Sequence, residues 1–266
     1  MDSLLTTAIH AATDAGAFIM SQYGHSETTL KADMSPVTQA DIGANTRILD
    51  ILLHTGIPIL SEESLDLSHI SFPYPETLWI IDPLDGTRDF INGTDDFSVM
   101  IGLLHRGRPI LSVVYAPATK TLFYAESGKG AFMKQGEVLT QLQVSNRVKP
   151  DLHFIKSKYH YSDSMETIAQ KLFVTKATPR GSVGIKAGIL GTREGDFFFY
   201  LGPLGVWDIC GPELIVEEAG GKVTDLYGNP IAYTDAKHRI SQGIVFSNCA
   251  CHGDVLEAVR TTLFEE

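Results

Sequence analysis

Cysteine, basic residues and long apolar runs are scarce in this chain. Only three cysteines occur among its 266 residues, a small odd number that argues against a disulfide-stabilised secreted domain. No run reaches the roughly 18 apolar residues of a membrane-spanning helix. The 21 Lys and Arg residues against 32 Asp and Glu residues leave a net charge of −11, which argues against a nucleic-acid polymer as partner, because such binding needs a basic surface.

The amino terminus and the cysteine spacing favour a cytoplasmic protein. Residues 1–16 carry an acidic residue and amphipathic spacing, where a secretory signal would begin with basic residues. Cys249 and Cys251 are separated by one residue, unlike the two-residue spacing of zinc or redox pairs. We therefore expect reduced thiols. The 44% apolar content predicts a core in one large domain or two closely packed halves.

The stretch from Trp79 to Phe90 is the most informative part of the sequence. An apolar run at Trp79–Ile81 is typical of an interior strand, and Asp82-Pro83 ends it because proline has no ladder donor. Asp85 follows across a turn stiffened by the proline, so the two carboxylates can face one centre. At about 4 Å they would repel by roughly 1 kcal/mol in water and about 4 kcal/mol at an effective dielectric near 20, which favours a shared proton or a hard cation such as Mg²⁺.

Gly86 and Thr87 follow directly and predict a phosphate-binding turn. Glycine allows backbone N–H groups to approach a ligand closely, and threonine adds a hydroxyl group near the start of a helical turn. The alternative is an ordinary surface turn, since Asp-Pro and Asp-Gly pairs are common in loops.

Two motifs give the chain a family resemblance. D-P-L-D-G-T after an apolar strand resembles the first signature of the inositol monophosphatase superfamily of Mg²⁺-dependent, lithium-sensitive phosphatases, and W-D-I-C-G-P-E from Trp207, running on to Glu218-Ala-Gly-Gly, resembles the second. The resemblance implies an α+β fold, a layered αβαβα sandwich of the inositol monophosphatase and fructose-1,6-bisphosphatase type. Its first half would carry an antiparallel sheet and its second a mixed, largely parallel sheet.

The same resemblance implies a site that binds two or three Mg²⁺ ions. The metal ligands would be Glu62, Asp82, the Leu84 carbonyl, Asp85 and Asp208, and the catalytic residues Asp33, Thr38 and Glu63. Asp33 and Thr38 lie in a K-x-D-x-S-P-V-T-x-A-D element, where the family's aspartate and threonine orient the attacking water. A loop with a helix cap explains that segment equally well. The substrate-binding residues would be Glu62, Leu84, Asp85, Gly86, Thr87, Arg88, Lys186 and Asp208.

Two of these acidic positions also have local interpretations. Glu62 and Glu63 follow a predicted strand, where neighbouring residues point to opposite sides, so we expect Glu62 to ligate metal and Glu63 to hold water or a neighbouring ligand. Asp208 precedes a predicted helix, where an N-cap aspartate contributes about 1 kcal/mol without any catalytic role. We expect Asp208 to do both.

Substrate choice is indicated by smaller matches. T-R-D-F-I, S-P-V-T and V-V-Y-A-P resemble the 3′(2′),5′-bisphosphate nucleotidases of the superfamily, which implies hydrolysis of adenosine 3′,5′-bisphosphate to AMP and phosphate. Arg88, Arg180 and Lys186 are candidates for contacting the second phosphate, although each could be an ordinary surface charge. Inositol 1-phosphate or fructose 1,6-bisphosphate hydrolysis is the alternative, and a non-catalytic protein that binds phosphorylated ligands is a more remote one.

The pattern of elements predicts two halves, residues 1–147 and 148–266. We expect a monomer or homodimer, which the pattern does not decide. Helical spacing and capping predict helices at about 4–23, 40–54, 164–172 and 181–190, and from residue 255 onward. The core face of the second helix would consist of Ile42, Ile48, Leu49 and Leu52. Short β-rich runs separated by turns predict an antiparallel meander over residues 97–134. After about residue 150, strands alternate with helices, which is typical of a parallel or mixed sheet.

Overall fold

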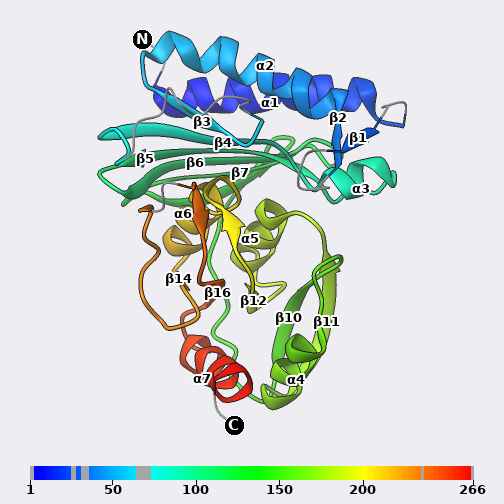
Figure 1. Cartoon of the computed structure of the whole chain (residues 1–266), viewed down its shortest axis with the longest axis vertical. Coiled ribbons are helices and arrows are strands. Elements are labelled where there is room, and N and C mark those ends of the chain that lie inside the picture. Colours follow the sequence, from blue (N-terminus) through cyan, green and yellow to red (C-terminus); the bar gives the residue numbers. More distant parts are fainter. Residues whose placement is uncertain (1–2, 25–27, 31–35, 64–72, 235–236, 265–266) are drawn as a thin grey trace.

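The computed structural model arranges the chain in five layers (Figure 1). It describes residues 3–24, 28–30, 36–63, 73–234 and 237–264. From the top of Figure 1, a pair of helices covers a large twisted sheet, two further helices separate it from a second sheet, and a last helix pair lies against the outer side. This order confirms the predicted αβαβα sandwich.

The first layer consists of α1 (Leu4–Gln22) and α2 (Gln39–Leu52), which is followed by the 3-10 turn η1 (Leu53–Thr55). Ser3 caps α1, and Thr38 caps α2 in a capping box with Asp41. Ile48 and Leu52 of α2 are buried as predicted. Ile42 was predicted to belong to the same core face, but it is 47% exposed. The prediction was wrong because alanines at 40 and 44 form the contact surface at this end of the helix.

The second layer is a sheet with the order β3-β4-β5-β6-β7-β8-β9. The pair β3–β4 is parallel, and the remaining pairs are antiparallel, so the predicted meander is confirmed. The exposed strand β9 at the sheet edge was not predicted. The strands are β3 (Ile59–Ser61), β4 (Thr77–Asp85), β5 (Ser98–His105), β6 (Arg108–Ala116), β7 (Thr121–Glu126), β8 (Gly130–Gln135) and β9 (Val138–Gln141).

The remaining layers come from the second half of the chain. Helices α5 (Val183–Gly191) and α6 (Cys210–Glu218) lie between the sheets, and α4 (Asp163–Lys171) and α7 (His252–Leu263) lie outside. The sheet order is β11-β10-β12-β16-β14. Its strands are β10 (Leu152–Ser157), β11 (Val174–Arg180), β12 (Phe197–Tyr200), β14 (Gly221–Thr224) and β16 (Ile244–Asn248).

The second sheet is mixed, as predicted, but it is not largely parallel. In the described residues, β10 pairs in parallel with β11 and β12, whereas β16 pairs antiparallel with β12 and β14. Smaller elements complete the fold: the pair β1 (Thr28–Leu30) and β2 (Pro36–Thr38), the pair β13 (Leu204–Gly205) and β15 (Arg239–Ile240), helix α3 (Thr87–Ile91) and the 3-10 turn η2 (Val206–Asp208).

One hydrophobic cluster joins the two sheets. It contains Leu78 and Met100 from the first sheet, Leu214 from α6 and Phe246 from the second sheet. Because this core is shared, a division of the chain into halves near residue 147 stays a prediction. All three cysteines are free thiols, and Cys210 and Cys251 are buried. Among the described helices, none combines the length and apolar character needed to cross a membrane.

Candidate active site

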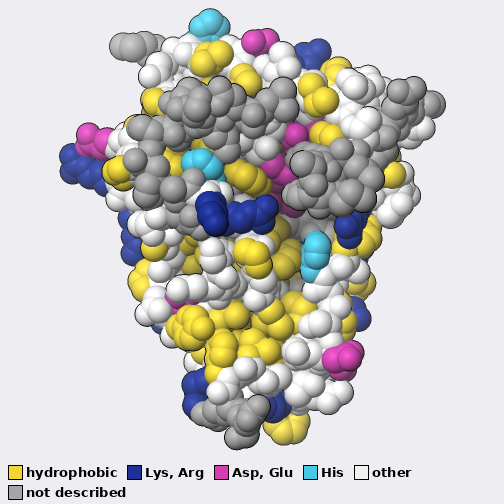
Figure 2. Space-filling view, in the orientation of Figure 1, with side chains coloured by type: hydrophobic (Ala, Val, Ile, Leu, Met, Phe, Trp, Pro, Cys, Tyr) yellow, Lys and Arg dark blue, Asp and Glu magenta, His cyan; other side chains and the backbone are white. Residues whose placement is uncertain are grey.

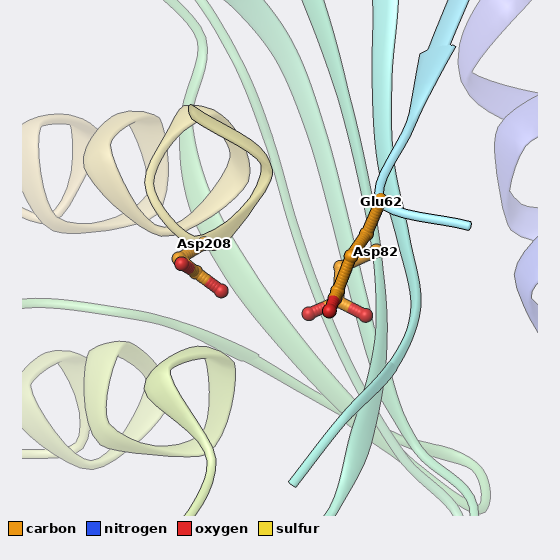
Figure 3. Close-up of side chains that lie close together, drawn as sticks. All are labelled: Glu62, Asp82 and Asp208. Atoms are coloured by element: carbon orange, nitrogen blue, oxygen red, sulfur yellow. The ribbon is translucent and has the colours of Figure 1, made fainter. Parts of the chain in front are cut away.

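Three carboxylates from distant parts of the chain meet beside the first sheet. Ligand atoms of Glu62, Asp82 and Asp208 all lie within 4.8 Å of one another. Parallel pairing of β3 with β4 sets Glu62 next to Asp82, because the Glu62 N–H donates to the Ile81 carbonyl. Asp208 approaches from the opposite side with its carboxylate directed at the other two (Figure 3). The predicted gathering of these residues is therefore what the structure shows.

Asp208 reaches the cluster from η2, the 3-10 turn before α6. Its carboxylate accepts a hydrogen bond of 2.8 Å from the backbone N–H of Gly205. We predicted that Asp208 would cap the following helix, and this was wrong. Helix α6 begins at Cys210 without a side-chain cap, and Asp208 instead closes its own turn.

The donor set fits a hard divalent cation. Burial raises the pKa of Asp82 well above its usual value, and the charges of Glu62, Asp85 and Asp208 raise it further. Loss of hydration also raises the pKa of Asp208, and the negative charges of Glu62 and Asp85 raise it further. Carboxylates that are hard to ionise together lose this penalty when a cation lies between them, and oxygen-only ligands suit Mg²⁺. The cluster can therefore hold a metal ion.

Asp85 lies beside the cluster and is held from the other half of the chain. Its Oδ2 accepts hydrogen bonds from the Ser182 hydroxyl at 2.5 Å and from the Gly184 N–H at 3.0 Å. Burial raises the pKa of Asp85 to about 6, although these two hydrogen bonds and the charge of Lys186 oppose the rise. Asp85 is not part of the three-residue group in the described residues, so its role as a ligand stays a prediction.

Thr87 forms a pair with Asp41 that the sequence did not reveal. The Thr87 hydroxyl lies 3.0 Å from Asp41 Oδ1 and 3.2 Å from the Leu84 carbonyl oxygen. A hydroxyl has one proton, and a carboxylate is the stronger acceptor, so Thr87 donates to Asp41. The Thr87 oxygen then keeps lone pairs for a water molecule, and the Leu84 carbonyl remains available as a ligand.

The pair predicted from the sequence, Asp33 with Thr38, has a different setting. Asp33 lies outside the described residues. The Thr38 hydroxyl donates to Asp41 Oδ2 at 2.7 Å, and the Thr38 N–H donates to the same oxygen. Thr38 thus holds the carboxylate that Thr87 contacts. These hydrogen bonds oppose the rise in the pKa of Asp41 that its burial causes.

The turn after β4 requires glycine at its first position. Gly86 has a φ of 95°, and a Cβ there would lie 2.7 Å from the Asp96 carbonyl oxygen. The turn leads into α3, whose first N–H groups have no partner within the helix. Glu63 was expected to face away from Glu62 along a strand, but both residues follow the end of β3 in a turn.

A cavity of about 240 Å³ opens onto these groups. Four acidic residues line it, together with the phosphate-turn residues and three aromatic side chains. The lining is Pro36, Glu62, Asp85, Gly86, Thr87, Arg88, Asp89, Tyr159, His160, Gly181, Val183, Tyr200, Leu204 and Asp208. Figure 2 shows acidic side chains in a recess of this face, with Lys and Arg side chains beside it.

Lys186 does not line this cavity, and its role as a phosphate contact stays a prediction. It is fully buried, and its Nζ donates to the Tyr200 hydroxyl at 2.6 Å and the Gly181 carbonyl at 3.0 Å. Burial lowers the pKa of Lys186 to about 8 against the opposing effect of Asp85. Arg180 lies 3.7 Å from Asp96 in an ion pair and is likewise absent from the lining. The sequence alone could not show that α5 turns Lys186 inward.

Comparison with known proteins places the chain in a family. The model of the inositol monophosphatase family matches residues 1–261. The chain belongs to this family. A relative from Salmonella typhimurium named 3′(2′),5′-bisphosphate nucleotidase CysQ is 35% identical over 245 residues, which cover 90% of this chain and 98% of the relative. A Thermotoga maritima relative named fructose-1,6-bisphosphatase/inositol-1-monophosphatase is 32% identical over 237 residues, 86% of this chain and 84% of the relative.

Solved structures of the family agree with the fold. An inositol monophosphatase (IMPase) from Thermotoga maritima matches with a TM-score of 0.83 at 29% identity, covering 98% of both chains. CysQ from Bacteroides thetaiotaomicron matches with a TM-score of 0.80 at 28% identity, covering 92% of this chain and 97% of that one. The resemblance inferred from the two sequence motifs is confirmed.

Proposed function

We propose that this protein is a Mg²⁺-dependent 3′(2′),5′-bisphosphate nucleotidase that hydrolyses adenosine 3′,5′-bisphosphate to AMP and phosphate. The observation that carries the proposal is the three-carboxylate group of Glu62, Asp82 and Asp208. Two of its members, Glu62 and Asp208, line one cavity with Thr87, whose hydroxyl is paired with Asp41. The nucleotidase names of relatives at 33–35% identity support this substrate.

The proposed ligands are those predicted from the sequence: Glu62, Asp82, the Leu84 carbonyl, Asp85 and Asp208, for two or three ions. Bound Mg²⁺ would lower the pKa of the attacking water and stabilise the charge that develops on the leaving oxygen. Ser182 and Gly184 both donate hydrogen bonds to Oδ2 of Asp85. Because these bonds fix the orientation of the carboxylate, its Oδ1 would be directed to the metal. Glu63 would hold a water molecule near Glu62.

Thr87 and Asp41 would orient the attacking water. Since the Thr87 proton is directed to Asp41, the Thr87 oxygen can accept a hydrogen bond from the water and aim its lone pair at phosphorus. Thr38 keeps Asp41 in place. The backbone N–H groups after Gly86 would contact the phosphate oxygens, and Arg88 would bind the second phosphate group.

A second candidate is hydrolysis of inositol 1-phosphate or fructose 1,6-bisphosphate, which the name of the Thermotoga maritima relative favours. The deciding experiment measures phosphate release from adenosine 3′,5′-bisphosphate, inositol 1-phosphate and fructose 1,6-bisphosphate in parallel, with Mg²⁺ and with or without lithium. We expect preference for the nucleotide and inhibition by lithium. A preference for inositol phosphate would contradict the nucleotidase assignment, and absence of any turnover would favour a phospho-ligand binding protein. A cytoplasmic location and a monomeric or dimeric state stay predictions.

A further inference from the structure

The segment Lys158–His160, which follows β10, is fastened to the short helix that begins at the phosphate turn. Lys158 Nζ lies 2.7 Å from Asp89 Oδ1 and 2.6 Å from Asp96 Oδ2. The Tyr159 ring lies under the guanidinium of Arg88, with 5.6 Å between the guanidinium carbon and the ring centroid. A long hydrogen bond of 3.4 Å from Asn92 reaches the Tyr159 hydroxyl. The second half of the chain thus contacts α3 and the residues that follow it through both Lys158 and Tyr159.

Arg88 is the one Lys or Arg side chain among the described residues that line the cavity. Four carboxylates line the same space, those of Glu62, Asp85, Asp89 and Asp208. In the described part of the chain, Arg88 has no ion pair with any of them. Arg88 is exposed, and its guanidinium lies over the Tyr159 ring instead.

The Tyr159 ring contacts the Arg88 guanidinium in a cation–π interaction. A guanidinium that stacks on an aromatic ring contacts it through the flat face of the guanidinium. The N–H donors lie in the guanidinium plane, so they remain available to bind two phosphate oxygens. The ring is itself held, because the ion pairs of Lys158 fix the backbone on one side and a hydrogen bond from the His160 N–H to the Ser157 hydroxyl fixes it on the other.

We propose that Tyr159 is a positioning residue for substrate specificity. It holds the Arg88 guanidinium at the cavity rim and away from the metal-binding carboxylates, so that Arg88 can pair with the phosphate group that is not hydrolysed. This inference rests on the proposed nucleotidase function, and it adds the residue that lets the site distinguish a bisphosphate from a monophosphate.

The test compares two substrates that differ only in the second phosphate: adenosine 3′,5′-bisphosphate and adenosine 3′-monophosphate. Values of kcat and KM are measured with Mg²⁺ for the wild type, Arg88→Gln, Tyr159→Leu, Tyr159→Phe and Tyr161→Leu. Tyr161 serves as the matched control, because its ring also contacts a cation, Lys156 at 4.8 Å, but it is not among the described cavity-lining residues.

We expect Arg88→Gln to remove most of the preference for the bisphosphate. Tyr159→Leu should raise KM for the bisphosphate roughly three- to tenfold, in keeping with a partly exposed cation–π contact, with a much smaller change in kcat and in KM for the monophosphate. Tyr159→Phe, which keeps the ring, should restore the preference, and Tyr161→Leu should resemble the wild type.

Two outcomes overturn the inference while leaving the nucleotidase function intact. Equal losses for both nucleotides in Tyr159→Leu would indicate base stacking or a general structural role, and an unchanged preference would show that Arg88 needs no support from the ring. Failure of the wild type to hydrolyse either nucleotide, together with turnover of inositol 1-phosphate, would instead refute the proposed function and this inference with it.

Discussion

Replacement of Asp208 by asparagine should stabilise the protein in the absence of metal while greatly reducing its stabilisation by Mg²⁺. Asp208 faces two carboxylates, with ligand atoms within 4.8 Å. At this separation each pair of charges repels by roughly 3.5 kcal/mol at an effective dielectric near 20, and by roughly 0.9 kcal/mol in water. Asparagine removes the charge and can still accept the hydrogen bond from the Gly205 N–H.

The gain has an upper limit, because the native protein can also relieve the repulsion by taking up a proton. At pH 7 this requires roughly 4 kcal/mol for a carboxyl group of ordinary pKa. Asp208 is only half-buried, so water screens part of the repulsion. We therefore expect the metal-free variant to gain about 1–4 kcal/mol, an increase in Tm of at least about 2 °C.

The assay is thermal unfolding at about pH 7 in chelator and in excess Mg²⁺. At a hundredfold excess of Mg²⁺ over Kd, the wild type should gain about 2.7 kcal/mol in stability and melt at a higher Tm, and Asp208→Asn should gain much less. Asp50→Asn removes the same charge from an exposed position on α2 and should behave as the wild type. The reasoning fails if Asp208→Asn melts at or below the wild type in chelator and still responds fully to Mg²⁺.

Three further predictions concern single side chains. Thr87→Val should lower kcat by about 10²- to 10⁴-fold, the range of lost proton-transfer assistance, and Thr87→Ser should restore much of it, as phosphate-release kinetics would show. Asp85→Asn should lose more than about a hundredfold in activity and keep a native circular dichroism spectrum, and near-normal turnover would rule out its role as a ligand. Burial raises the pKa of Glu213 from 4.5 to about 8, so the native state binds a proton that the unfolded chain releases. This contribution to stability is complete below about pH 4.5 and falls, by roughly 5 kcal/mol in total, as pH rises to about 8. Denaturant titrations at several pH values should therefore show that the free energy of unfolding falls less steeply with pH in Glu213→Gln than in the wild type. Equal slopes in the two proteins would contradict the raised pKa of Glu213.

The sequence predicted elements where local rules dominate. The interior strand at Trp79–Ile81 and the meander have apolar runs bounded by turn residues, and both are present. Prediction from the sequence failed for residues whose burial depends on packing partners that only the folded structure brings together. Strand β11 was missed because its residues are mostly exposed and include Pro179, so it shows no alternation of apolar and polar residues. Ile42 was wrongly predicted to be buried, because the alanines of α2 at positions 40 and 44 are the buried residues at this end of the helix.

The site shows the same division. Glu62, Asp82 and Asp208 could be predicted as a group because the two motifs resemble the family's signatures, and that resemblance implies this ligand set. Asp41 could not, since its three-residue spacing from Thr38 is that of an ordinary capping box. Asp41 and Thr87 are 46 residues apart in the sequence, and no local sequence pattern predicts that their side chains meet.

The two sheets must pack together before the cavity has its chemical properties. Asp208 approaches the first sheet from η2, and α5 holds Asp85 through Ser182 and Gly184. Ser98 of β5 contacts Ser182 at 2.9 Å in the same interface. The carboxylates that repel one another are thus supplied by both sides of a shared hydrophobic core, whose burial opposes the repulsion. A cation that binds between them therefore strengthens the contact between the sheets, so metal binding and packing of the second sheet should be thermodynamically linked.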